Sequence, residues 1–169
     1  MKEEKTTKRM NLQDLQSFLK RKTKQEAAME KAEKLSKQEI EDFFGTIVIP
    51  AFETIKRTLA EYNLEKVQIE NHNIVANLRV VEPLTNFLFK VKIDNDSRLL
   101  RIKGILKYKE NLRDKLNTTL DSHSKLISFK ELDKLDQKTI ISFFTEWYTT
   151  KDEGIAKTKA FRAQQEKTD

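Results

Sequence analysis

The sequence predicts an α+β domain in which a long kinked central helix packs on a four- to five-stranded antiparallel meander. An N-terminal helical arm and a C-terminal helix flank this core. Apolar residues recur at three- and four-residue steps in residues 36–62, the apolar period changes to two in residues 67–109, and the helical period returns after Asp136. A chain of 169 residues has room for one such domain once its charged ends are set aside.

The first 35 residues are predicted to form a basic tail and a helical arm. Met1 to Met10 is rich in lysine and lacks apolar periodicity, whereas Asn11 is a suitable N-cap for the helix after it. Short amphipathic helices need tertiary packing to persist, so we expect this one to dock on a protein partner or on a second copy. The apolar residues predicted to form the oligomer or partner interface are Leu12, Leu15, Phe18, Leu19 and Met29.

The central helix is predicted from Ser36 to Tyr62. Its opening, Ser36-Lys37-Gln38-Glu39, has the form of a capping box, in which the serine hydroxyl accepts a backbone hydrogen bond and the glutamate carboxylate reaches back. Pro50 removes one backbone donor and presses on the carbonyl of Thr46, so we expect a kink there rather than two separate helices. The apolar stripe that needs a partner surface contains Ile40, Phe43, Phe44, Ile47, Phe52, Ile55 and Leu59.

Four strands joined by polar turns are predicted in the middle of the chain. Their alternation gives one apolar face, which we expect to receive the central helix, and one basic outer face. A symmetric turn at Asn95-Asp96 would place Lys90 opposite Arg101, and like charges in that position repel. The cations predicted on the outer face are Arg79, Lys90, Lys92, Arg101, Lys103, Lys107 and Lys109.

The rest of the domain is less regular. Leucines four residues apart predict either a short helix or a structured loop from Glu110 to Ser124. Ile127, Phe129 and Leu132 are predicted to cover an edge of the core, and a fifth short strand is one form that this cover can take. Asp136 caps the C-terminal helix, whose aromatic stripe is typical of core packing.

These elements predict a core domain over residues 36–150 and a polar C-terminal tail over residues 151–169.

The composition of the chain excludes several classes of function. The chain has no cysteine, which excludes disulfides, thiolate nucleophiles and zinc sites that use cysteine. It has no apolar run of membrane-spanning length and begins without an apolar leader, so we expect a cytoplasmic protein without a membrane partner.

Catalysis is not predicted. The three glycines belong to no phosphate-binding or dinucleotide-binding pattern. His72, in a predicted hairpin turn, and His123, in a predicted polar loop, have no second histidine at metal-ligand spacing and are interpreted as surface residues. We therefore expect no cofactor, no metal and no small-molecule substrate. A small enzyme is a third possible class of function, and it requires that loops interpreted as structural come together in the fold.

Positive charge is concentrated in two regions, with 11 basic against 7 acidic residues in 1–39 and 9 against 5 in 64–109. The first region contains a basic run made of Lys20, Arg21, Lys22 and Lys24. We expect a non-catalytic interaction protein, an adaptor or complex subunit, that associates through its N-terminal helical arm and forms a homo-oligomer.

The alternative is a nucleic-acid binder without sequence specificity that uses the basic run and the outer face. No aromatic residue stands among the cations of that face, which argues against base stacking. Lysines on strands also keep proteins soluble and discourage pairing at sheet edges. A solubilising face, or one covered by an acidic protein partner, is therefore favoured over nucleic-acid binding.

Overall fold

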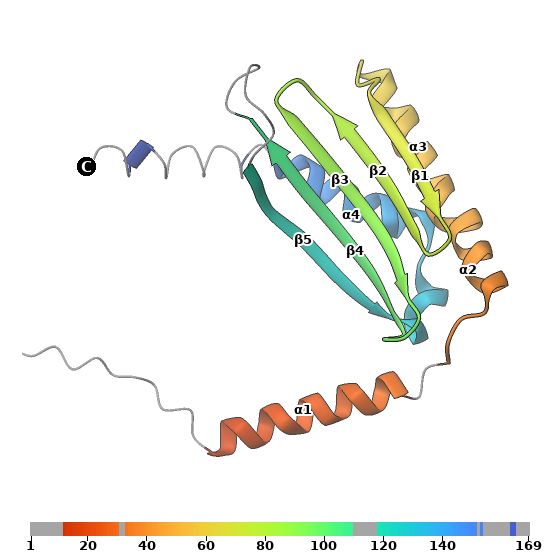
Figure 1. Ribbon diagram of the computed structural model, residues 1–169, viewed down its shortest axis with the longest axis vertical. Coiled ribbons are helices and arrows are strands. Elements are labelled where there is room, and N and C mark those ends of the chain that lie inside the picture. The colour runs from red at the N-terminus through yellow and green to blue at the C-terminus, as the bar shows by residue number, and fades with distance from the viewer. Residues whose placement is uncertain (1–11, 31–32, 110–117, 152, 154–162, 165–169) are drawn as a thin grey trace, which may run out of the picture. The chain divides into compact units, whose positions relative to one another are not determined.

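The computed structural model describes residues 12–30, 33–109, 118–151, 153 and 163–164, and it confirms the α+β fold. The chain divides into two compact units, Met1–Glu33 and Lys34–Asp169. The first contains helix α1, Leu12–Glu30. The second contains the sheet with its covering helices, drawn in Figure 1. Asn11, the predicted cap of α1, lies outside the described residues.

The predicted central helix consists of three joined segments: α2, Lys37–Phe43; a π-helical turn η1, Phe44–Val48; and α3, Ile49–Glu61. The capping box is confirmed, because the Ser36 hydroxyl accepts from Glu39 N–H at 3.2 Å and the Glu39 carboxylate accepts from Ser36 N–H at 2.7 Å. The buried residues of this helix are Ile40, Phe44, Val48, Ala51, Phe52 and Ile55.

Pro50 lies in the first turn of α3, directly after the wider π-helical turn. Proline has no N–H, so the Thr46 carbonyl loses the partner that an α-helix would give it. The Gln137 side chain, at the start of the C-terminal helix, donates to this carbonyl at 3.0 Å. The irregular turn therefore precedes the proline, and a side chain from the neighbouring helix satisfies the carbonyl that the proline leaves free.

The sheet is a five-stranded antiparallel meander in the order β1-β2-β3-β4-β5. Alternation of burial along β2, β3 and β4 gives one buried face, as predicted. The strands are β1, Val67–His72; β2, Val75–Val81; β3, Thr85–Asp94; β4, Leu99–Tyr108; and β5, Thr118–Ser128.

The predicted register between β3 and β4 is wrong by two residues. Lys90 faces Lys103 rather than Arg101, because the strand pair closes at Asp94 and Leu99. The turn is longer than predicted: the Asp94 carboxylate accepts from Ser97 N–H at 3.1 Å, and Arg98 adopts a left-handed conformation with φ of 52°. The sequence places Asp94 to Ser97 in the turn, but alternation alone does not reveal that Arg98 belongs to it as well.

The prediction of a helix or loop up to Ser124 is also wrong, because β5 begins at Thr118. Between Gly104 and Leu106 of β4, the pairing shifts from His123 to Leu120, so β5 carries one extra residue there. Such a bulge interrupts the period of two that identifies a strand. Residues 110–117 lie outside the described part of the chain. Ile127 is buried within β5, whereas Phe129 and Leu132 lie in the 3-10 helix that follows, so the predicted fifth strand is confirmed only at Ile127.

A short 3-10 helix η2, Phe129–Lys134, leads into the C-terminal helix α4, Gln137–Thr149. Asp136 caps α4 as predicted, since its carboxylate accepts from Thr139 N–H at 2.8 Å. Phe89 of the sheet makes edge contacts with Phe52 of α3 and with Trp147 of α4, at ring centroid distances of 5.9 Å and 5.7 Å. Both helices therefore cover the same face of the sheet, and Figure 1 shows α4 crossing behind the strands.

Candidate functional site

Helix α1 presents a stripe of exposed apolar side chains. Leu12, Leu15, Phe18 and Leu19 have exposed fractions between 44% and 76%. Successive residues of a helix are about 100° apart, so these four lie within about one third of its circumference. The stripe is about two turns long. Met29 belongs to α1, but its side chain lies outside the described part of the structure.

The basic run on α1 does not form one patch. Helical geometry places Lys20, Arg21 and Lys24 on the side opposite the apolar stripe, whereas Lys22 lies in line with the stripe. Lys22 Nζ is 4.0 Å from the carboxylate of Glu26, one turn further along. The polar side of α1 thus carries three of the four predicted cations, and the fourth has an acidic neighbour.

The outer face is the side of the sheet opposite α3 and α4, and it gathers most of the other predicted cations. Directly opposed residues in antiparallel strands share a face. Lys90 faces Lys103, and Lys92 faces Arg101. Such opposed like charges are destabilising by about 0.2–1 kcal/mol. The cations of the outer face are Arg79 on β2, Lys90 and Lys92 on β3, and Arg101, Lys103 and Lys107 on β4.

One of these cations is neutralised within the protein. The Arg101 guanidinium donates to Asp94 from two nitrogens, at 3.0 Å and 3.2 Å. The hydrogen bond from Ser97 N–H is the largest cause that lowers the pKa of Asp94, and Arg101 lowers it further. Within the described residues, no ion pair involves the five other cations of the outer face, which are Arg79, Lys90, Lys92, Lys103 and Lys107.

The outer face has little apolar surface. Leu88 and Ile105 face each other at its centre and are half-buried. Leu126, on the edge strand β5, faces Arg101 and is 51% exposed. This leucine was not predicted on the outer face, because the sequence does not reveal the register of β5. No Phe, Tyr or Trp lies on this face among the residues that the structure describes.

Lys109 lies one residue beyond the end of β4 and beside a surface cavity. With Lys66 and Glu82 it helps to line a cavity of about 530 Å³ between the end of α3 and the β2–β3 turn. A cavity of about 340 Å³ lies at the opposite end of β1 and includes Ile40 and Ile74. Both cavities are lined by side chains of mixed chemistry, without a convergent set of acid, base and nucleophile.

A polar cluster at the β2–β3 turn was not predicted. The Glu82 carboxylate accepts from Thr85 Oγ1 and from the Tyr148 hydroxyl, each at 3.0 Å, and from Lys151 Nζ. Lys151 is only 9% exposed, and its ammonium lies 4.7 Å from the centre of the Tyr148 ring. Burial alone would raise the pKa of Glu82, but the hydrogen bonds and the charge of Lys151 outweigh it and lower that pKa.

This cluster fixes the end of α4 to the sheet. Its acid and its base come from segments 69 residues apart, so no local motif identifies the pair in the sequence. Lys151 is the first residue of the segment predicted as a tail, and the cluster accounts for its burial. We interpret the cluster as a structural contact, because all three donors point at one oxygen of the same carboxylate.

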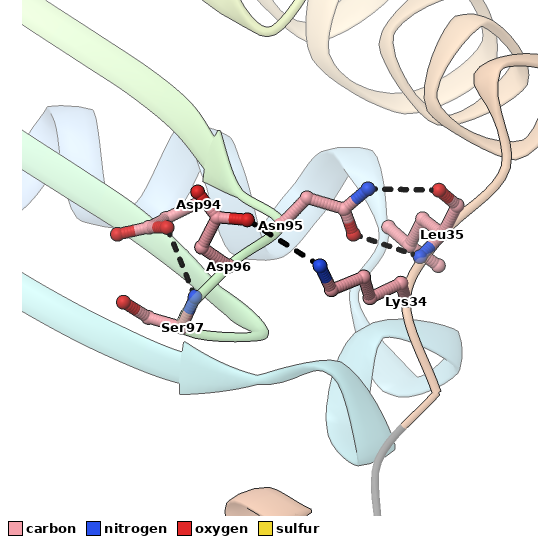
Figure 2. A network of polar contacts seen from close by, with 6 residues as sticks. All are labelled: Lys34, Leu35, Asp94, Asn95, Asp96 and Ser97. Atoms are coloured by element: carbon pink, nitrogen blue, oxygen red, sulfur yellow. Dashed lines mark hydrogen bonds and ion pairs between the residues drawn. The ribbon is translucent and has the colours of Figure 1, made fainter.

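A second unpredicted contact holds the start of the second unit. The Asn95 side chain accepts from Leu35 N–H at 2.9 Å and donates to the Leu35 carbonyl at 3.0 Å. Beside it, Lys34 Nζ lies 3.4 Å from the Asp96 carboxylate. Figure 2 shows these residues around the β3–β4 turn. The turn that shifts the register therefore also anchors the segment that leads into α2.

The two predicted surface histidines differ in their surroundings. His72 is exposed, as predicted, but it is the last residue of β1 and pairs with Val75 rather than lying in the turn. His123 lies on β5 rather than in a loop, and its ring stacks on Trp147 with a centroid distance of 5.5 Å. Among the described residues, no group of three or more His, Asp or Glu side chains is placed to hold a metal ion.

The chain matches no protein family, no curated protein and no solved structure. In the part of the chain that the structure describes, no helix is both long enough and apolar enough to cross a membrane. The structure brings together the cations of β2, β3 and β4, and it places the apolar stripe and most of the basic run on opposite sides of α1. The candidate sites are therefore two surfaces, one on each unit.

Proposed function

We propose that this protein is a non-catalytic interaction subunit that assembles with a second copy of itself through the apolar stripe of α1. The observation that carries the proposal is the exposure of the stripe: Phe18 is 58% exposed and Leu12 is 76% exposed. In proteins most of the stability of a helix comes from packing of its apolar side rather than from helix propensity. Pairing of two stripes would remove this apolar surface from water and stabilise both helices.

The spacing along α1 supports helix pairing. The positions in line with the stripe are Leu12, Leu15, Leu19, Lys22 and Glu26, separated by steps of three and four residues, as in the seam between paired helices. Charged residues at seam positions specify the register of a helix pair and lower its stability. We therefore expect a reversible assembly whose mass depends on protein concentration.

The opposite side of α1 supports the same assignment. It carries Lys20, Arg21 and Lys24, which would stay in water when the stripes pair. Cations on the polar side keep a helix soluble and limit its association to the apolar side. The geometry favours a discrete assembly over unlimited aggregation.

The test is light scattering coupled to size-exclusion chromatography on the full chain over a range of concentrations. A monomer has a mass of 19.9 kDa, and we expect a larger mass for the native sequence. Leu15→Glu combined with Leu19→Glu places two acids on the stripe and should yield the monomer. Gln13→Glu combined with Ser17→Glu is the matched control, because it adds two acids with the same spacing on the opposite side. A native chain that is monomeric at every concentration would refute the proposal.

A further inference from the structure

We propose that the outer face of the sheet binds the phosphodiester backbone of nucleic acid, independently of assembly through α1. The contacts come from the cations that form no ion pair within the described residues: Arg79, Lys90, Lys92, Lys103 and Lys107. They lie on the same face of three adjacent strands, β2, β3 and β4.

The position of these cations in the sheet argues against protection of sheet edges. Lysines that discourage unwanted strand pairing belong on edge strands. Here the edges are β1 and β5, whereas the cations lie on interior strands. The outward residues of β1 are Gln68, Glu70 and His72, none of them lysine or arginine. The basic surface therefore lies on interior strands, which already have a partner on each side and need no protection against further pairing.

The register gives the surface its affinity for a repeating anion. The opposed pairs Lys90–Lys103 and Lys92–Arg101 form a block of four cations, of which Arg101 is already paired with Asp94. Opposed side chains start about 5 Å apart, and residues two apart along a strand are separated by about 7 Å. A single carboxylate can neutralise only one such charge. A polymer of phosphates can neutralise several at once, relieve their mutual repulsion and release the counterions that it had bound.

The other side chains of the face favour the backbone over the bases. Asn86 faces Lys107 and Ser124 faces Lys103, so neutral hydrogen-bonding groups flank the cations. Such groups are typical partners of phosphate and sugar oxygens. The absence of Phe, Tyr and Trp among the described residues of this face leaves no platform for base stacking. We therefore expect binding without sequence preference.

An acidic protein is a weaker match. Protein interfaces depend on buried aromatic or apolar anchors near their centre. The centre of this face offers only Leu88 and Ile105, both half-buried in the sheet. The exposed Leu126 lies at one edge. Val75 and Val81, on β2, are also half-buried on this face. The central side chains that reach furthest into solvent are therefore charged or hydrogen-bonding ones.

The test is fluorescence anisotropy of the full chain with labelled mixed-sequence oligonucleotides, one single-stranded and one duplex. Salt is varied from about 50 to 200 mM, where phosphate contacts strongly affect affinity. Lys90→Gln combined with Lys103→Gln removes the central opposed pair. Lys56→Gln combined with Arg57→Gln is the matched control, because it removes the same charge from the exposed side of α3. A third variant, Lys20→Gln with Lys24→Gln, tests the basic side of α1.

We expect Lys90→Gln with Lys103→Gln to weaken binding about tenfold or more, while the α3 control binds like the native chain. The slope of log affinity against log salt should become shallower by about 0.7 for each phosphate that the variant leaves unneutralised on the single-stranded probe, or about 0.9 on duplex. Light scattering of each variant should show an unchanged mass, which separates this result from the proposed assembly.

Three outcomes would overturn the proposal. The first is no binding of either probe at the lowest salt. The second is a loss of binding in the α1 variant or the α3 control that equals the loss in the outer-face variant. The third is binding of polyglutamate, but of neither oligonucleotide, that depends on Lys90 and Lys103, since it would assign the face to an acidic protein.

Discussion

A methyl group added at Gly104 tests the packing of the sheet against α4. Gly104 lies on the covered face of β4, opposite His123. A Cβ atom at this position would lie 3.0 Å from Trp147 Cε3 and 3.1 Å from Phe87 Cζ. Neither ring can move away easily, because Phe87 makes edge contacts with Phe144 and Tyr148, and Trp147 is stacked on His123. Gly104→Ala should therefore strain the core.

The magnitude follows from two opposing effects. Overpacking a core costs about 1–3 kcal/mol, whereas alanine in a strand recovers about 0.5–1 kcal/mol relative to glycine. Because both neighbouring rings are held, we expect overpacking to dominate, with a net loss of about 1–2 kcal/mol. In a chain of this size the loss lowers Tm by roughly 2–8 °C.

The same change at Gly45 is the matched control. Gly45 lies in the π-helical turn, and an added Cβ would meet nothing within 4 Å. Gly45→Ala should raise stability by about 0.5–1 kcal/mol, because alanine restricts the unfolded chain and favours helix. Thermal and urea unfolding measure both variants. Trp147 is the single tryptophan, so its fluorescence reports directly on the Gly104 contact. A Gly104→Ala variant as stable as the native chain would refute the reasoning.

Three other contacts give testable expectations. The pKa of Glu82 is lowered in the folded protein. The stability that the charged Glu82 contributes is therefore present above its ordinary pKa of 4.5 and is lost as pH falls through the lowered value. The difference in unfolding free energy between the native chain and Glu82→Gln should be largest at neutral pH and vanish in acid. Gln137→Ala should lower the free energy of unfolding by about 0.5–1.5 kcal/mol. In a Pro50→Ala background the loss should be small, because the backbone N–H of residue 50 can then donate to the Thr46 carbonyl. Equal losses in the two backgrounds of a double-mutant cycle would contradict this. Asn95→Ala should speed hydrogen exchange at the Leu35 amide, and unchanged protection would count against that contact.

Much of the fold follows from sequence patterns that depend on local chemistry. The capping box at Ser36, the N-cap at Asp136 and the alternation along β2, β3 and β4 each involve neighbours within a few residues. The orientation of the outer-face cations follows from the same alternation. These features were predictable because period and cap chemistry determine them before any tertiary contact forms.

The errors have a different origin. The register of Lys90 depends on how many residues the β3–β4 turn absorbs, and that number depends on the Asp94 contact and on the left-handed Arg98. The first part of β5 was missed because its bulge opposite β4 interrupts the alternation. The Glu82–Lys151 contact joins distant segments. Local sequence patterns carry no information about such long-range contacts.

For the candidate surfaces too, local patterns were predictable and long-range arrangement was not. The stripe on α1 was predictable as a set of residues from Leu12 to Leu19, because the spacing along one helix determines it. The basic face was predictable as a set of cations, but the pairs that oppose each other were not. That interior strands carry the charge became evident only from the strand order.

The most direct test of the central claim is disulfide trapping between copies. The chain has no cysteine, so each variant carries a single thiol. Cysteine is introduced on the stripe, as Leu12→Cys, Leu15→Cys or Leu19→Cys, and on the opposite side, as Gln13→Cys or Ser17→Cys. A disulfide requires Cα atoms within about 7 Å. Mild oxidation should give a covalent dimer from at least one stripe variant and from neither control. Dimers only from the controls, or from none of the five, would contradict assembly through α1.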